Sequence, residues 1–244
     1  GSMPASRLQI IQAQEQQLLE TYALLGDVAV RIVVFNASAS AYTNGWVSVT
    51  DAIAYVNGIS ATGGTNYDAA LLTAISAFQS AGKIPGGTNV SYFLSDGEPT
   101  TAQDWDGSGP LPNQVGIQPG DGNNTEEGRW KAFLETNKIN SFAFAMGTSV
   151  QQGSMDPIAY NGEARVNTNA VVVTREADLP PIIRDTVNAV LQGNFLNGTM
   201  GNASGAGADG GELTSFAIDG TTYFANGTVT GTSRGTFDAS TKSW

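Results

Sequence analysis

The chain has 244 residues, 41% of them hydrophobic, which is enough for one large α/β domain or for a medium domain and a small one. Its 22 acidic and 11 basic residues give a formal net charge of -11, which argues against nucleic acid or an anionic membrane as partner. The absence of cysteine and histidine excludes disulfides, zinc sites of the Cys/His type and hydrolases that need a histidine base. No apolar stretch approaches ~18 residues, so we expect no membrane insertion.

Strands and helices alternate along most of the chain. Apolar residues of the first segment recur with helical spacing, and Gly26 after them suits a C-terminal cap. The next segment is rich in β-branched residues with few polar interruptions, as in a strand covered on both faces. In chain order the patterns predict helices over 6–26, 48–59, 66–82, 126–138 and 178–191, and strands over 28–36, 89–96, 139–147 and 170–174. This alternation predicts an α/β fold with a doubly wound, mostly parallel sheet.

The character of the sequence changes after about Gly193. The remaining residues show no helical period, contain many glycines and threonines, and include short alternating runs such as "LTSFAI" and "TTYFA". We therefore predict two domains, an α/β domain over 1–192 and a linker with a β-rich segment of a neighbouring module over 193–244. Limited proteolysis is expected to cut first between Gly193 and Gly211, where small residues leave the backbone exposed.

Two loops place polar residues beside predicted elements. "ATGGTNYDAALLTA" (61–74) puts Thr65 in front of a helix, with Asp68 three residues later, which is the pattern of a helix cap and its acidic partner. "SYFLSDGEPT" (91–100) carries an apolar strand into an acidic turn at Asp96. Each loop alone is explained by ordinary capping or turn formation. In an open parallel sheet, however, the carboxyl ends of the strands are where ligands bind.

Together, "GGTNYDAAL" and "FLSDGEP", about 30 residues apart, closely resemble two motifs of von Willebrand factor A domains. In that family a D-x-S-x-S loop, a threonine and an aspartate form a metal-ion-dependent adhesion site (MIDAS). The resemblance covers roughly residues 1–192, implies a Rossmann-like fold, and assigns metal-ligating roles to Thr65 and Asp96. A hydroxyl and a carboxylate suit a hard divalent cation, Ca²⁺ or Mg²⁺. Thr65 can cap its helix and face a metal at once.

The first strand of the family and its D-x-S-x-S loop are missing from this sequence. Bacterial members often read D-x-S-G-S-M there, so Gly1–Met3 resembles the tail of that motif and Ser2 its second serine. Gly-Ser-Met is also a common leftover of cloning. The strands 28–36 and 89–96 would flank the absent strand. Residues upstream of Gly1 could fill the gap, another segment could fill it, or the two strands could close on each other. We favour the first.

The composition and the Gly/Thr-rich tail further resemble the A domain of large bacterial RTX adhesins, which are secreted by type I systems. This implies a metal-dependent adhesion module, extracellular or on the bacterial surface, that binds a protein or glycan through a ligand carboxylate and adjoins other adhesin modules. Two alternatives remain: a structural spacer whose metal only stabilises the fold, and the A-type domain of an ATP-driven chelatase-like complex. We expect no enzymatic activity, because no credible nucleophile–base pair is present.

Overall fold

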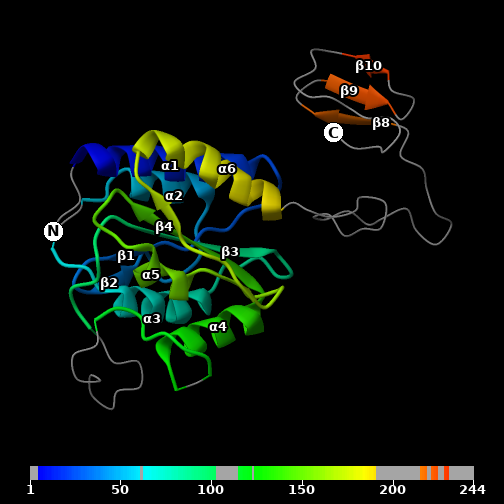
Figure 1. Ribbon diagram of the computed structural model, residues 1–244. Coiled ribbons are helices and arrows are strands. Elements are labelled where there is room, and N and C mark those ends of the chain that lie inside the picture. The colour runs from blue at the N-terminus through cyan, green and yellow to red at the C-terminus, as the bar shows by residue number, and fades with distance from the viewer. Residues whose placement is uncertain are drawn as a thin grey trace. The chain divides into compact units, whose positions relative to one another are not determined.

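The computed structural model describes residues 5–60, 63–102, 115–122, 124–190, 215–218, 221–224 and 228–230. The chain divides into two compact units, Gly1–Val187 and Asn188–Trp244. The first unit is built around a mixed sheet with helices on both faces (Figure 1).

The long strand pair at the centre of this sheet is parallel, as the sequence predicts. Strand β3 (Asn89–Ser95) runs alongside β4 (Ile139–Met146) over its whole length. The end of β4 pairs in parallel with β7 (Val171–Val173). The start of β4 pairs instead with an antiparallel hairpin, β5 (Tyr160–Asn161) and β6 (Val166–Asn167). The mostly parallel α/β sheet is therefore confirmed, and the hairpin is an addition that the sequence patterns did not predict.

The strand predicted over 28–36 is shorter and differently paired. It is reduced to β1 (Val33–Phe35), which forms a separate antiparallel sheet with β2 (Ala39–Ala41), and its residues are partly exposed rather than covered on both faces. Among the described strands, none pairs with the edge of β3 that faces away from β4. The two strands have therefore not closed on each other by backbone pairing. Their side chains do meet, with the rings of Phe35 and Phe93 stacked and their centroids 5.0 Å apart.

Alternate residues of β3 contact the two helix layers, because successive strand side chains point to opposite faces. On one face, the hydroxyl of Tyr92 is 2.8 Å from that of Tyr22 and 2.9 Å from that of Thr186. On the other, the ring of Phe93 packs edge-on against Tyr67. Figure 1 shows the first layer above the sheet and the second below it. The upper layer contains α1 (Ala5–Ala23), α2 (Val49–Val56) and α6 (Leu179–Val190), and the lower α3 (Tyr67–Phe78) and α4 (Glu126–Asn137).

The main apolar core lies between the sheet and the helices α3 and α4. Its large members are fully or almost fully buried, and Trp130 at 1% exposure donates its indole N–H to the carbonyl of Ile158 at 3.0 Å. Ile158 belongs to a short segment after β4 made of α5 (Gln152–Met155) and a 3₁₀ turn, η1 (Asp156–Ile158). A second 3₁₀ turn, η2 (Glu176–Asp178), leads into α6. This core fixes the ends of β3 and β4, where the candidate site lies.

The second unit contains the β-structure predicted for the tail. Strands β8 (Ser215–Ile218), β9 (Thr221–Phe224) and β10 (Val229–Thr230) form an antiparallel sheet in that order. The predicted cleavage region between Gly193 and Gly211 lies outside the described residues.

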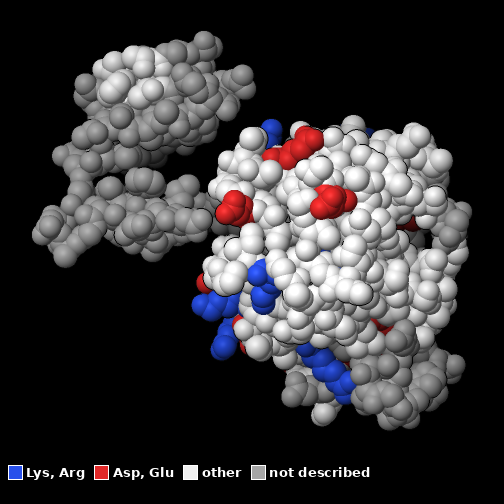
Figure 2. Space-filling model, turned by 180° about the vertical axis from the view of Figure 1, so that it is seen from behind, with Lys and Arg blue, Asp and Glu red and all other residues white. Residues whose placement is uncertain are grey.

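The surface carries few charged groups, as a charged content of 14% requires. Figure 2 shows one face of the molecule, on which isolated acidic and basic side chains are separated by large uncharged areas. No helix in the described part of the chain has the length and apolar character needed to cross a membrane.

Candidate functional site

The helix after the glycine-rich loop begins one residue later than the sequence predicts. The N-cap of α3 is Asn66, whose side-chain oxygen accepts a hydrogen bond from the backbone N–H of Ala69 at 2.9 Å. Its side-chain nitrogen donates to the carbonyl of Ala37 in the β1–β2 connection at 3.3 Å. The capping role predicted for Thr65 is therefore wrong. The hydroxyl of Thr65 is not used to start the helix.

The two motif loops are bound to each other. The backbone N–H of Thr65 donates to the hydroxyl of Thr100 at 3.0 Å, and the backbone N–H of Thr100 donates to the carbonyl of Thr65 at 2.7 Å. Thr65 is 6% exposed. A Cβ on Gly97 would lie 3.0 Å from the Thr65 hydroxyl oxygen, closer than ordinary contact, so a side chain there would press on Thr65. The structure thus places the Thr65 hydroxyl against the residue that follows Asp96.

Two hydroxyl groups hold the loop after β3 in place. The buried Tyr67, on the first turn of α3, donates its hydroxyl to the carbonyl of Gly97 at 2.7 Å, and Ser95 donates to the same carbonyl at 3.1 Å. Burial raises the pKa of the Tyr67 hydroxyl above its ordinary value, so it remains a donor. Glu98 turns away to α5, where its carboxylate accepts from the Ser154 hydroxyl at 2.6 Å and from the backbone N–H of Gln151.

The Asp96 carboxylate already carries a cationic partner. Its Oδ2 is 3.3 Å from Nη1 of Arg7, a residue in the first turn of α1, and the side chains of Asp96 and Arg7 are 13% and 21% exposed. A cation therefore lies at this carboxylate. The hydroxyl of Thr65, which lies against Gly97, is a second oxygen of the kind that hard divalent ions prefer. The Thr65 hydroxyl and the Asp96 carboxylate fit the predicted metal in their chemistry. In this structure the positive charge next to Asp96 is the guanidinium of Arg7.

The third predicted ligand, Ser2, lies outside the described residues, so the predicted set of three is represented here by Thr65 and Asp96. Within the described residues there is no group of three or more acidic side chains that would hold a metal by themselves. Any cation at this edge of the sheet would therefore be only partly neutralised by Asp96. Nothing in the sequence pattern pointed to Arg7, which lies 89 residues from its partner.

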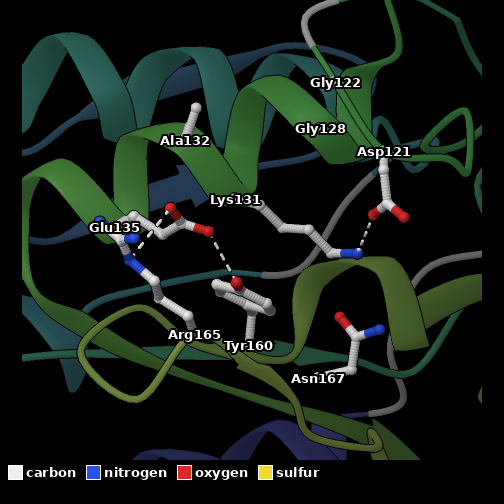
Figure 3. Close-up of a pocket in the computed structure, with 9 residues that line it drawn as sticks. All are labelled: Asp121, Gly122, Gly128, Lys131, Ala132, Glu135, Tyr160, Arg165 and Asn167. Carbon is white, nitrogen blue, oxygen red and sulfur yellow. Dashed lines mark hydrogen bonds and ion pairs between the residues drawn. The ribbon is translucent and has the colours of Figure 1, made fainter.

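A separate pocket of about 430 Å³ lies between α4 and the β5–β6 hairpin. Figure 3 shows that its charged side chains point toward one another. Glu135 accepts a hydrogen bond from the Tyr160 hydroxyl at 2.7 Å and pairs with Arg165 at 3.5 Å, while Lys131 pairs with Asp121 at 3.0 Å. The lining does not include Thr65 or Asp96, and its opposite charges satisfy one another. We assign it no function.

Solved structures with a similar fold include a von Willebrand factor type A protein from Catenulispora acidiphila, with 17% identity and a TM-score of 0.51 over 76% of this chain and 39% of that one. Proximal thread matrix protein 1 of the mussel byssus, in a structure with a zinc-occupied MIDAS motif, gives 13% identity and a TM-score of 0.51 over 74% of this chain. BatB from Bacteroides thetaiotaomicron gives 16% identity and 0.50, over 75% of this chain and 87% of its own.

These likenesses show that the chain has a von Willebrand factor A-like, Rossmann-like fold. This chain spans only 40% of the length of the mussel protein. No family model and no curated protein matches the sequence.

Proposed function

We propose that the α/β unit is a metal-ion-dependent binding module of a large secreted or surface-displayed bacterial adhesin. The observation that carries this proposal is the meeting of the Thr65 and Asp96 loops at the carboxyl end of β3, where Thr65 and Thr100 are hydrogen-bonded to each other. The hydroxyl of Thr65 and the carboxylate of Asp96 thus belong to two loops that are bound to each other at this edge of the sheet. Binding, rather than catalysis, is the activity that such a pair supports.

The proposed cation is Ca²⁺ or Mg²⁺, because the available donors are a hydroxyl and a carboxylate. When bound, the ion supplies a positive charge that holds a carboxylate of a protein or glycan partner. Thr65 is positioned by Thr100, and Asp96 is positioned by the anchoring of Gly97 to Tyr67 and Ser95. The zinc in the MIDAS motif of the mussel protein supports a divalent ion as the class of ligand.

A spacer role is the second candidate, and one observation favours it. Asp96 pairs with Arg7 of α1, and its loop is bound to Tyr67 and Ser95, so this edge already joins separate elements of the fold and a cation at Asp96 would strengthen a structural link. In a spacer, the cation would add stability and no partner would bind. Surface display and neighbouring adhesin modules are common to both roles.

The test is the melting temperature of the full chain with Ca²⁺, with Mg²⁺ and with a chelator. A ligand that binds only the native state stabilises it by about 2.7 kcal/mol at 100 times its Kd. We expect both cations to raise the melting temperature of the wild type and to leave Asp96→Asn and Thr65→Val unaffected. Equal melting temperatures for the wild type with cation and with chelator would sink the proposal.

A second measurement separates the adhesion module from the spacer. A surface coated with carboxylated polysaccharide should retain the wild-type chain in Ca²⁺ and release it in chelator. If the coated surface does not retain the chain and a soluble carboxylate does not bind it, while Ca²⁺ still raises its melting temperature, the spacer role is favoured.

A further inference from the structure

The side chain of Arg7 lies where three separate segments of the chain meet. It lies in the first turn of α1, its Nη1 is 3.3 Å from Asp96 after β3, and its planar head lies against Gly147 at the end of β4. A Cβ on Gly147 would come within 2.9 Å of Nη2 and 3.0 Å of the central guanidinium carbon. Gly147 also has a positive φ of 87°, which favours glycine, and its lack of a Cβ lets the guanidinium lie directly against the backbone. Arg7 therefore contacts both the Asp96 carboxylate and the backbone at Gly147, and the pair is mostly shielded from solvent.

The guanidinium of Arg7 contacts the same carboxylate that we propose as a metal ligand, that of Asp96. A guanidinium carries its charge at every accessible pH, so it cannot lose a proton to make way for a second cation. A divalent ion bound by Asp96 beside Thr65 would lie a few ångströms from this fixed charge. Like charges at that range oppose each other strongly where solvent is partly excluded. The metal and the guanidinium therefore cannot both occupy Asp96 at full strength.

We propose that Arg7 is an internal counter-ion that competes with the divalent cation for Asp96. This inference rests on the proposed metal site. In the metal-free state Arg7 neutralises Asp96 and ties the first turn of α1 to the loop after β3. Cation binding displaces the guanidinium and frees that tie. Because linkage is reciprocal, whatever loosens the first turn of α1 also raises the affinity for the cation.

The experiment is a calorimetric titration of the full chain with Ca²⁺ alone and with Mg²⁺ alone. Arg7→Gln removes the competing charge, and we expect it to bind the cation on the order of 10-fold more tightly than the wild type, within the range usual for coupled sites. Arg7→Met provides a second neutral replacement of similar length. Arg7→Lys keeps the charge and should stay near the wild-type affinity.

The matched control is Arg175→Gln, which makes the same change in net charge at an exposed pair with Asp178. It should leave the affinity unchanged. The melting temperature gives an independent readout. In chelator, Arg7→Gln should melt below the wild type because it lacks the Asp96 pair, and saturating Ca²⁺ should reduce or reverse that difference.

The possible results separate this inference from the metal site itself. If Asp96→Asn abolishes binding while Arg7→Gln and Arg7→Met keep the wild-type affinity or weaken it, Arg7 is not a competitor and the metal site stands. If Arg175→Gln tightens binding as much as Arg7→Gln, the effect is one of net charge and the inference fails. Wild-type affinity in Asp96→Asn would overturn the metal site and the inference together.

Discussion

Thr65 and Thr100 hold each other by reciprocal hydrogen bonds, in which the backbone N–H of each donates to an oxygen of the other, at 3.0 Å to the Thr100 hydroxyl and at 2.7 Å to the Thr65 carbonyl. This pair joins the loop before α3 to the loop after β3. The candidate site therefore depends on Thr100, although we do not assign Thr100 as a metal ligand.

Replacing Thr100 tests that dependence. Thr100→Val removes the acceptor of the Thr65 N–H and should lower the free energy of unfolding by about 1 kcal/mol, the usual worth of one hydrogen bond. It should also weaken cation binding, because the Thr65 loop is then less firmly placed. Thr100→Ser keeps the hydroxyl and is the control. Urea unfolding and calorimetric titration measure both effects, and a stable Thr100→Val with wild-type affinity would contradict the positioning role.

The helix cap and the metal ligand are separate residues, and substitutions should separate their effects. Asn66→Ala removes the cap of α3 and should cost about 1 kcal/mol of stability. Asn66→Asp keeps an accepting oxygen and should cost less. Thr65→Val should cost cation affinity while leaving the cap intact. Urea unfolding with titration of the same variants would contradict this division if Thr65→Val lost as much stability as Asn66→Ala.

Glu15 gives the domain a predicted pH dependence. Desolvation of its partly buried side chain raises the pKa of the Glu15 carboxyl from 4.5 to about 7. The folded state then holds a proton that the unfolded state releases, so stability falls as the pH rises from about 4.5 to about 7 and remains lower above that. Glu15→Gln lacks this loss and should exceed the wild type by up to roughly 3 kcal/mol at pH 8 and match it at pH 4.

Urea unfolding at pH 4, 6 and 8 measures this difference. Glu20→Gln, an exposed position on the same helix, is the control and should follow the wild type at all three values. Parallel curves for Glu15→Gln and the wild type would show that the Glu15 carboxyl is as well solvated in the folded chain as in the unfolded one.

Two carboxylates pair with Lys131 in very different surroundings. Glu127 lies 2.7 Å from the Lys131 ammonium and is 13% exposed, whereas Asp121 lies 3.0 Å away and is 92% exposed. Glu127 also accepts the backbone N–H of Gly120 at 2.6 Å. Glu127→Gln should cost about 1–3 kcal/mol because it weakens a buried charged network. Asp121→Asn should stay within about 0.5 kcal/mol, since exposed ion pairs contribute little. Equal losses by urea unfolding would contradict this ranking.

The sequence predicted those parts of the fold that rest on long, regular patterns. The apolar run 89–96 and the helical spacing after Asn66 have one interpretation each, and the structure contains both β3 and α3. The meeting of the two motif loops followed from the same patterns, because a parallel sheet brings strand ends and helix starts to one edge. The β5–β6 hairpin could not be predicted, since strands of two residues show no period.

The finer features of the site depend on contacts between distant parts of the chain. Asn66 rather than Thr65 caps α3, while the backbone of Thr65 is bonded to Thr100, 35 residues away in the chain. Arg7 meets Asp96 only because α1 and β3 are adjacent in the folded unit. The desolvation of Glu15 likewise arises from packing, and its neighbours along α1 give no sign of it.

The one-sided pairing of β3 has a consequence for the behaviour of the molecule in solution. Seven consecutive residues of this strand are bonded to β4 on one side, while no described strand meets the other. Where one edge of a strand is left unpaired, its peptide groups are a template onto which a strand of another molecule can add. Samples of this chain should therefore self-associate as the concentration rises, with scattering intensity that grows faster than the protein content. A charged residue introduced at Ser91 should slow that growth.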